Sequence, residues 1–468
     1  MKKGEIILIP VESIASGTMG NLLYYVAIVG VLLVIATLLR LKIPFLRKAF
    51  IPASLLAGLI GLVLGPHVLQ VIPADMMSSI GNLPTHMITI VFACMLLGNK
   101  KQENTSKEML HDVLSGLGWL WSNSFMQVGV ACLLCAFLFT PVMGVNPLFG
   151  SLFEIGFAGG HGTAGGMSGL FQDPAALNWA DGADLGMTTA TIGLLSGIFG
   201  GMIIINYGVR KKYTKVLTEP AKTGVAKEVF PDGQREPAAF MTVSQDVVEP
   251  FAFHLGIIGI AILIGRLIVW GFGELFGYTG LPLFPFAMIG GLIINTIVMR
   301  TPLADLFDKG IFQRIQGMAL EILIVAAMAS IQIPVVLAYW LPLLIGSVVI
   351  IGLVVVWFFF ISPYIFKDCW FEQGIIRYGA YTGVAAVGYM LLRTCDPKME
   401  TNAGSLYALT CPFHSPFIGG GLVTTAYPYI ILQFGSLTTG LMLCAGSLAI
   451  LLVLRLFFWD KNAKKQQR

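Results

Sequence analysis

Long apolar runs divide the chain into segments of the length that crosses a lipid bilayer. A bilayer core takes about 20 mostly apolar residues per helix, so each run of that length predicts a membrane-spanning helix. Two further segments, 147–172 and 373–396, are apolar but rich in glycine or interrupted by charge. The eleven spanning stretches that the pattern predicts are 21–39, 51–69, 84–99, 114–140, 184–207, 250–270, 283–299, 315–332, 337–362, 403–432 and 438–458.

The composition agrees with this pattern. Of the 468 residues, 56% are hydrophobic and only 12% are charged, whereas a soluble protein carries about 25% charged residues. So little charge cannot cover a water-exposed surface, and we therefore expect an all-α polytopic membrane protein embedded in a lipid bilayer. The seven cysteines follow no spacing pattern, so they predict no disulfide framework.

The stretch Gly150–Asp173, GSLFEIGFAGGHGTAGGMSGLFQD, is the most unusual in the chain because it is apolar, rich in glycine and free of lysine and arginine. Glycine inside a helix costs about 0.5–1 kcal/mol relative to alanine, which argues against an ordinary spanning helix. We expect the segment to enter the membrane, unwind at Gly159–Gly166 and leave on the side from which it came. Non-helical backbone is tolerated at that depth only where protein buries it or it lines a watery cavity.

The positions of the basic residues test this layout, because cytoplasmic loops carry an excess of lysine and arginine. If the first helix runs inward, only Lys2 and Lys3 lie outside, and the loops near 70–82, 141–183, 271–282 and 433–437 contain no basic residue. This alternation holds only if 147–172 and 373–396 do not cross the membrane. The inner loops then hold Arg40, Lys42, Arg47, Lys48, Lys100, Lys101, Lys107, Arg210, Lys211, Lys212, Lys215, Arg300, Lys309, Arg314, Lys367, Lys461, Lys464, Lys465 and Arg468.

Each of the two re-entrant segments follows four predicted helices and precedes a fifth. Since five is odd, the two halves lie inverted in the membrane, and the first segment enters from outside and the second from the cytoplasm. Inverted repeats with paired broken segments near the midplane are typical of secondary transporters. The predicted domains are a first repeat at 1–207, a cytoplasmic linker at 208–249, a second repeat at 250–432, and an additional transmembrane helix with a basic cytoplasmic tail at 433–468.

The two re-entrant segments are the predicted substrate site. Glycine lets the backbone approach a ligand closely, freed amides attract a carboxylate, and freed carbonyls coordinate sodium. His161 either donates to a substrate or holds its own loop, and the hydroxyls of Thr163 and Ser168 either bind or cap a half-helix. Tyr381, Thr382 and Gly383 are expected at the unwound second tip. The predicted substrate-binding residues are Gly160, His161, Gly162, Thr163, Ser168, Tyr381, Thr382 and Gly383.

Arg377, in the second segment, has two interpretations. It pairs with an acidic substrate, or it stays near the cytoplasmic face as a topology anchor, which we favour. His414 lies between two prolines in a helix that must break there, and we assign it no role.

Four polar residues in apolar helices are candidates for binding a cation. Glu321 is a cation ligand, a proton carrier or a partner of Arg314, because an acidic group inside a membrane helix is functional by default. Asn295 supplies an oxygen to sodium or, as we favour, a helix–helix hydrogen bond. Thr189 and Thr191 lie in the helix that follows the first re-entrant segment.

Several functions have no sequence support. The chain has no P-loop, no HExxH or GxSxG motif and no Cys/His set at metal-binding spacing. We therefore expect no enzyme activity, no cofactor, no metal beyond a sodium ion and no nucleic-acid partner.

The region from Pro147 to Gly201 resembles the glutamate:sodium symporter (ESS) family of bacterial secondary transporters. The matching residues are Gly159-Gly160-His161-Gly162-Thr163, Ser168, Leu170, Phe171, Met187, Ala190-Thr191, Gly193-Leu194 and Gly200-Gly201, with weaker correspondence at Ile51-Pro52, Ala57-Gly58, Gly98-Asn99 and Asn295. The second re-entrant stretch, GVAAVGYM, lacks the threonine and proline that the family carries there, and Gly420 or a neighbour stands where the family has an acidic residue.

This resemblance implies ten core helices in two inverted five-helix repeats, each with a re-entrant loop. It also implies a homodimer in the bacterial cytoplasmic (inner) membrane that imports glutamate or a related anionic carboxylate with Na+ as coupling ion, by an elevator-like movement. The alternatives are a proton-coupled carrier of another organic anion, or a channel or receptor built on a transporter fold.

Overall fold

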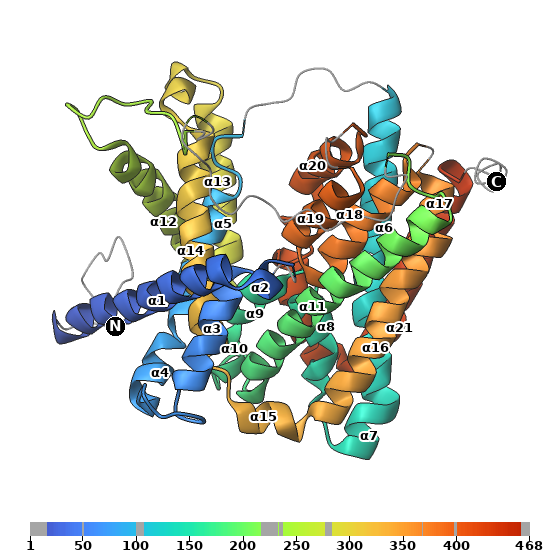
Figure 1. Cartoon of the computed structure of the whole chain (residues 1–468), viewed down its shortest axis with the longest axis horizontal. Coiled ribbons are helices and arrows are strands. Elements are labelled where there is room, and N and C mark those ends of the chain that lie inside the picture. Colours follow the sequence, from blue (N-terminus) through green and yellow to red (C-terminus); the bar gives the residue numbers. More distant parts are fainter. Residues whose placement is uncertain are drawn as a thin grey trace. The chain divides into compact units, whose positions relative to one another are not determined.

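The computed structural model describes residues 16–48, 51–99, 107–216, 233, 237–276, 283–366, 368–396 and 400–459 (Figure 1). Within these ranges every regular element is a helix, which confirms the all-α class. Most of the predicted linker, at 217–232 and 234–236, lies outside the described residues. So do several of the basic residues used to predict the topology, namely Lys2, Lys3, Lys100, Lys101, Lys367, Lys461, Lys464, Lys465 and Arg468.

Seven helices in the described part of the chain are long and apolar enough to cross a membrane. The apolar helices at 53–64 and 283–298 are shorter than the roughly 20 residues that a crossing takes. The protein is thus a multi-pass membrane protein. The seven spans are Gly20–Lys42, Leu110–Met143, Asp181–Arg210, Pro250–Leu275, Lys309–Ala329, Trp340–Ile365 and Leu422–Phe457.

The chain forms two compact units, and neither is simply one half of the sequence. Unit 1 comprises residues 1–42, 52–101 and 229–330, and unit 2 comprises 43–51, 102–228 and 331–468. Each unit therefore takes helices from both halves of the chain. The division into two inverted repeats is a separate matter and stays a prediction.

Unit 1 holds the helices that come first in each half, and small residues set how closely they pack. A Cβ added at Gly265 of α12 would lie 2.5 Å from the backbone nitrogen of Ala287 in α13, and one at Gly61 of α3 would lie 2.7 Å from the Cβ of Ala329 in α14. Such contacts let apolar helices approach closely. The elements are α1 (Ser16–Lys42), α3 (Ala53–Leu64), α4 (Ala74–Ile80), α5 (Leu83–Cys94), α12 (Pro250–Phe276), α13 (Leu283–Val298), η3 (Pro302–Leu306) and α14 (Lys309–Ala329).

Unit 2 holds the remaining helices and both predicted re-entrant segments. Its first part comprises α2 (Pro44–Lys48), α6 (Lys107–Leu134), η1 (Cys135–Phe139), α7 (Thr140–Met143), η2 (Pro147–Ser151), α8 (Leu152–Gly156), α9 (Gly160–Gly166), α10 (Ser168–Gln172) and α11 (Asp181–Arg210). Its second part comprises α15 (Ile333–Ala338), α16 (Trp340–Phe360), α17 (Ser362–Ile365), α18 (Trp370–Gly383), α19 (Ala385–Cys395), α20 (Ala403–His414) and α21 (Leu422–Phe457).

The last predicted core helix, 403–432, is broken where the sequence indicated. Helix α20 ends at His414, the chain is non-helical over 415–421, and helix resumes at Leu422. Helix α21 then continues to Phe457 past a non-helical Gly435 at φ 76°, which separates the end of the predicted core helix from the additional C-terminal helix. A left-handed φ of this kind suits glycine, which has no Cβ to clash.

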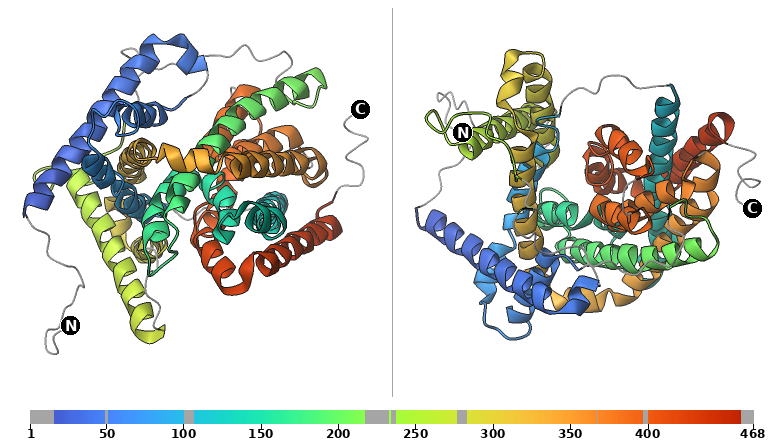
Figure 2. Two further views of the ribbon diagram at one scale, coloured as in Figure 1. Left: turned by 90° about the horizontal axis from the view of Figure 1, so that it is seen from below. Right: turned by 45° about the horizontal axis from the view of Figure 1, so that its top comes forward.

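The additional helix lies alongside α6, as both views in Figure 2 show. The two run antiparallel, because Gly118 of α6 faces Leu454 while Gly129 faces Cys444. The Ser447 hydroxyl donates to the Ser122 carbonyl at 2.6 Å. Unit 2 is thus built around α6 and α11, with α21 packed on α6.

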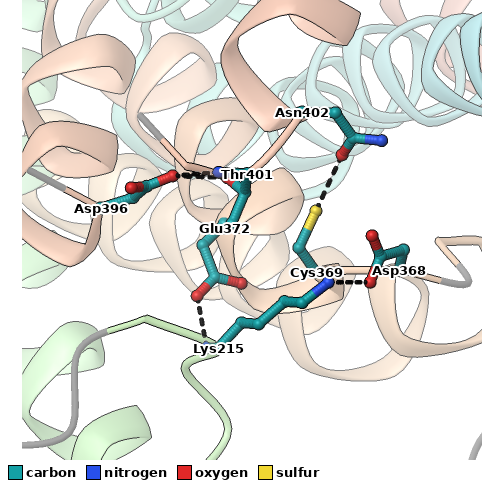
Figure 3. A network of polar contacts seen from close by, with 7 residues as sticks. All are labelled: Lys215, Asp368, Cys369, Glu372, Asp396, Thr401 and Asn402. Carbon is teal, nitrogen blue, oxygen red and sulfur yellow. Dashed lines mark hydrogen bonds and ion pairs between the residues drawn. The ribbon is translucent and has the colours of Figure 1, made fainter. Parts of the chain in front are cut away.

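At one end of unit 2 a polar network joins the chain after α11 to the start of α18 (Figure 3). The backbone N–H of Lys215 donates to Glu372 Oε1 at 2.6 Å, and its Nζ pairs with Asp368 at 2.6 Å. The hydrogen bond to Asp368 raises the pKa of Lys215 above its usual value. Asp396, at the end of α19, accepts from the backbone N–H groups of Glu400 and Thr401 and so caps the turn into α20.

The close approach of α6 and α21 yields a stability prediction. A Cβ at Gly129 would lie 2.7 Å from Cys444 Sγ and 2.9 Å from the Cys444 backbone nitrogen. Gly129→Ala must push the two helices apart, at a cost of about 1–3 kcal/mol. We expect a lower thermal melting temperature for the purified protein in detergent.

The matched control is Gly352→Ala on α16, since nothing lies within 4 Å of a Cβ at that position. There alanine gains helix propensity without a clash, so the melting temperature should hold or rise. Equal melting temperatures for the two variants would contradict the close α6–α21 contact.

Candidate functional site

The first glycine-rich segment forms a hairpin of short helices packed on the first half of α11. Thr189 of α11 donates its hydroxyl to the Leu152 carbonyl at 3.1 Å, and a Cβ on Gly193 would meet the Phe157 ring at 2.6 Å. Farther back along α11, a Cβ on Gly182 would lie 2.7 Å from the Phe171 ring of α10. The hairpin thus starts and ends beside the N-terminal end of α11 and turns beside its middle.

The prediction that this segment unwinds over Gly159–Gly166 is wrong in its extent. Gly160–Gly166 forms the helix α9, with Gly160 at φ 67°, and the chain is non-helical at residues 157–159 before it and at Met167 after it. Tertiary packing overrides the poor helix propensity of glycine here. A Cβ on Gly186 of α11 would lie only 3.6 Å from the Ala164 Cβ, so α9 rests closely on α11.

The second segment, α18 and α19, forms a hairpin on the other half of α11. A Cβ on Gly208 would overlap the Phe371 ring near the start of α18, and one on Gly197 would lie 2.8 Å from Thr382 Oγ1 near its end. The two arms pack tightly, since a Cβ on Gly379 would lie 2.7 Å from the Gly388 Cα. This hairpin starts beside the C-terminal end of α11 and also turns beside its middle (Figure 1).

The predicted unwound tip at Tyr381, Thr382 and Gly383 is also wrong in detail. All three residues belong to α18, and the turn is made by Val384, at φ 77° and ψ 161°. A β-branched residue with positive φ is a genuine backbone outlier, and sequence propensities do not predict it. Holding a residue in such a sparsely populated backbone conformation costs of order 1–3 kcal/mol, and residues of this kind cluster at functional sites.

The tips of the two hairpins meet. A Cβ added at Gly160 would overlap Cγ1 of Val384, so the turn of the second hairpin lies directly on the turn of the first. The break between α20 and α21 joins them, because a Cβ at Gly419 would lie 3.6 Å from the Ala158 carbonyl oxygen. Three interrupted segments of unit 2 therefore converge beside the middle of α11.

The predicted polar residues of the first tip bond mainly to protein groups. His161 Nε2 lies 3.0 Å from Thr191 Oγ1, which ties α9 to α11 and favours the loop-holding interpretation of this histidine. The hydroxyls of Thr163 and Ser168 donate to the carbonyls of Gly159 and Gly165, as local caps do. Gly162 lies within α9.

The predicted residues of the second tip differ in whether their hydroxyl groups have a hydrogen-bond partner. The Thr382 hydroxyl donates to the Tyr378 carbonyl at 2.8 Å. Tyr381 is 2% exposed, and its hydroxyl has no hydrogen-bond partner among the described residues.

The sequence pattern did not predict a role for the carboxylate at the centre of this region. Glu154, on α8, is fully buried, and its Oε1 accepts from Ser124 Oγ at 3.1 Å, from the Gly419 backbone N–H at 2.9 Å and from Thr424 Oγ1 at 3.2 Å. Its Oε2 has no partner among the described residues. The Ser124 hydroxyl also lies 3.3 Å from the Tyr427 hydroxyl.

Further polar groups of α6 extend this set toward α18. Gln127 donates from Nε2 to Asn123 Oδ1 at 2.8 Å and to the Tyr381 carbonyl at 3.1 Å. Gln127 Oε1 and Asn123 Nδ2 have no partner within the described ranges. We call these residues the buried polar cluster: Asn123, Ser124, Gln127, Glu154, Tyr381, Thr424 and Tyr427.

A signal for part of this cluster was present in the sequence. Glu154 is an acidic residue in an apolar stretch, which alone marks a functional candidate. The convergence of α6, α8, α18 and α21 on it could not be read from periodicity, because it depends on where three helices break.

The side chain of Arg377 is enclosed by protein, and both of its interpretations, substrate partner and cytoplasmic anchor, stay predictions. It is fully buried, with its guanidinium 4.4 Å from the Phe366 ring centroid and Nη1 donating to the Gln373 carbonyl at 2.8 Å. Its Nε and Nη2 have no partner among the described residues. A buried cation with free N–H groups is suited to bind an anion.

The two remaining cation candidates belong to unit 1. Asn295 Oδ1 accepts from the Gly98 N–H at 2.9 Å and its Nδ2 donates to the Asn99 carbonyl at 3.0 Å, so it bridges α13 to the end of α5. Glu321 is exposed on α14, and no ion pair with Arg314 occurs in the described part of the chain.

A multi-pass helical protein whose broken helices converge on buried polar groups has the architecture typical of secondary membrane transporters. A comparison with protein families makes this specific: the model of the sodium/glutamate symporter family matches residues 20–369. The match covers more than half of the chain, so the protein belongs to the sodium/glutamate symporter family, whose members are transporters that couple transport to sodium. It ends just before α18, so the second hairpin and the α20–α21 break lie beyond it. Searches of curated proteins and of solved structures gave no match.

The contact between the tips can be tested with a pair of glycines of nearly equal φ. Gly160→Ala places a Cβ against Val384, whereas Gly144→Ala, at φ 66°, meets nothing within 4 Å. Both carry the left-handed penalty of about 1–2 kcal/mol, but only Gly160→Ala adds overpacking of about 1–3 kcal/mol. We expect Gly160→Ala to melt at the lower temperature, and the opposite order would argue against the contact.

Proposed function

We propose that this protein is a sodium-coupled symporter that imports glutamate or a related anionic carboxylate. The observation that carries the proposal is the meeting of two hairpins from opposite ends of α11, with Gly160 against Val384. A ligand held at such a junction is reached from one face or the other by moving one hairpin. This is the arrangement that alternating access requires.

The two compact units support an elevator-like mechanism. All three interrupted segments belong to unit 2, so a solute bound there travels with that unit. The first three helices of each half contribute to unit 1 and the later ones to unit 2, as two repeats of the same plan would. We further propose that the protein is a homodimer of the bacterial inner membrane, as the resemblance implies.

Arg377 supports an anionic solute. A guanidinium that is buried without a carboxylate partner among the described residues is costly, and an incoming carboxylate would compensate its charge. Coupling then follows if solute and sodium each favour the state that the other binds, since linkage between two sites is reciprocal.

A channel is the second candidate, and the geometry favours it less. A pore needs a continuous polar path, whereas here hairpins from both ends of α11 close on each other at its middle. Proton coupling in place of sodium has one observation in its favour, the buried Glu154 carboxyl.

The direct test of the proposal is uptake of radiolabelled glutamate into proteoliposomes. An inward sodium gradient should drive concentrative uptake that saturates with glutamate, and an equal potassium gradient should not. Exchange of internal unlabelled for external labelled glutamate would identify a carrier. Uptake that does not depend on sodium would refute sodium coupling, and an absence of uptake for glutamate and related carboxylates would refute the substrate class.

A substitution can distinguish whether Arg377 binds the solute or only stabilises the fold. Arg377→Met removes a buried charge but keeps an apolar stem, so the melting temperature should hold or rise. Loss of a charge-assisted hydrogen bond of about 1.5–3 kcal/mol predicts about 10–100-fold weaker apparent affinity for the solute.

Arg393→Met is the matched control, because Arg393 lies on α19 of the same hairpin and is exposed. It should leave the apparent affinity unchanged. If Arg377→Met binds and transports like the unmodified protein, Arg377 does not contact the solute.

A further inference from the structure

The Glu154 carboxylate is only half satisfied by the protein. Three donors from α6, the α20–α21 break and α21 converge on Oε1, while Oε2 is equally buried and has no partner within the described ranges. An ionised carboxylate taken out of water costs several kcal/mol unless it is compensated. These three donors leave the charge uncompensated, so either a bound cation balances it or the carboxyl takes up a proton.

Within the described ranges no basic side chain pairs with Glu154. The ion pairs among the described residues are His111–Asp112 and Lys215–Asp368, and neither involves Glu154. The titratable groups that face the carboxylate are the phenols of Tyr381 on α18 and Tyr427 on α21, together with the polar but uncharged groups of α6. The charge is left for a small cation to balance.

The elements that contact Glu154 also carry oxygen atoms that are suited to a cation. Gln127 Oε1 is buried and unpartnered in the described structure, one helical turn along α6 from Ser124, and the Tyr381 hydroxyl is buried and unpartnered on α18. The Ala158 carbonyl lies at the break that follows α8, facing Gly419. Hard cations take carboxylate, carbonyl and hydroxyl oxygens as ligands.

We propose that Glu154 is the charged ligand of a monovalent-cation site in the buried polar cluster, with Gln127 Oε1 and the Tyr381 hydroxyl as further oxygens. This deepens the proposed function, on which it rests, by naming the residue that binds the coupling ion. The site joins α6, α8, α18 and α21, so a cation there links both hairpins and the α20–α21 break. Its occupancy therefore governs whether unit 2 is closed around a solute.

The decisive measurement is the thermal melting temperature of the purified full-length protein, without solute, in sodium chloride against choline chloride at constant ionic strength. A ligand that binds only the folded state stabilises it by RT ln(1 + [L]/Kd), so sodium should raise the melting temperature of the unmodified protein. Glu154→Gln should abolish this rise. Glu154→Asp, which keeps the charge on a shorter stem, should need about tenfold more sodium for the same rise.

A second readout distinguishes a binding site from a structural role. In choline, Glu154→Gln should melt higher than the unmodified protein, because the amide oxygen keeps the Oε1 contacts while the substitution removes the buried charge. If Glu154 has a purely structural role, Glu154→Gln should instead melt at a lower temperature than the unmodified protein in choline. The matched control is Glu321→Gln, since Glu321 is exposed on α14 of unit 1, and this variant should keep the full response to sodium.

Two measurements identify the cation. If the cation is sodium, sodium raises the melting temperature at constant pH, and protons compete with sodium for the site. If it is a proton, stability in choline changes between about pH 5 and 8 in a manner that Glu154→Gln abolishes; the two phenols do not titrate there, since tyrosine ionises near pH 10.

The proposal is overturned if Glu154→Gln keeps the sodium and pH responses of the unmodified protein. Should that variant fail to fold, Glu154→Asp replaces it in the test. The proposal is then overturned if Glu154→Asp needs no more sodium than the unmodified protein for the same rise in melting temperature. Because the melting temperatures are measured without transport, the proposed cation site and the proposed transport function can be refuted independently. Sodium-driven glutamate uptake that persists unchanged in Glu154→Gln refutes the site alone, and a Glu154-dependent cation response without any uptake refutes the function alone.

Discussion

The constraint on which this structure depends is that a bilayer offers no water to an interrupted helix. Every backbone N–H and C=O at that depth must find a partner within the protein, so helix breaks are tolerated only where other helices enclose them. Unit 2 satisfies this condition at three places, residues 157–159, Val384 and residues 415–421, all gathered beside the middle of α11. Concentrating the breaks in one compact unit leaves the polar groups they expose next to one another, and this proximity creates the site.

The hydrophobic pattern predicted much of the fold because helix length and bilayer thickness are physically linked. The predicted stretch 184–207 lies within α11, and 337–362 overlaps α16. The sequence also indicated both glycine-rich segments, since a segment that is apolar and yet poor as a helix has few alternatives. Apolar length alone could not show that α3 and α13 are shorter than a full crossing.

The details of the site were beyond sequence reasoning for two different reasons. Glycine propensity predicted an unwound stretch at Gly159–Gly166, but the absence of side chains also lets α9 lie against α11, and packing prevailed. The turn at Val384 uses a residue that disfavours its own conformation, which only the surrounding contacts can impose. Glu154 was recognisable by chemistry, whereas Thr189, Thr382 and Asn295 looked similar in sequence and are occupied by structural hydrogen bonds.

The additional helix, packed along α6 from Gly118 to Leu133, has an electrostatic consequence. Attraction between two charges varies inversely with the permittivity around them, and is several-fold stronger near a protein interior than in water. Because α21 packs on α6, the helix that supplies Ser124 and Gln127 is covered by protein on this side as well. The C-terminal helix adds no charged group of its own to the buried polar cluster, but it helps to keep the cluster inside protein, where an attraction to Glu154 is stronger than it would be in water.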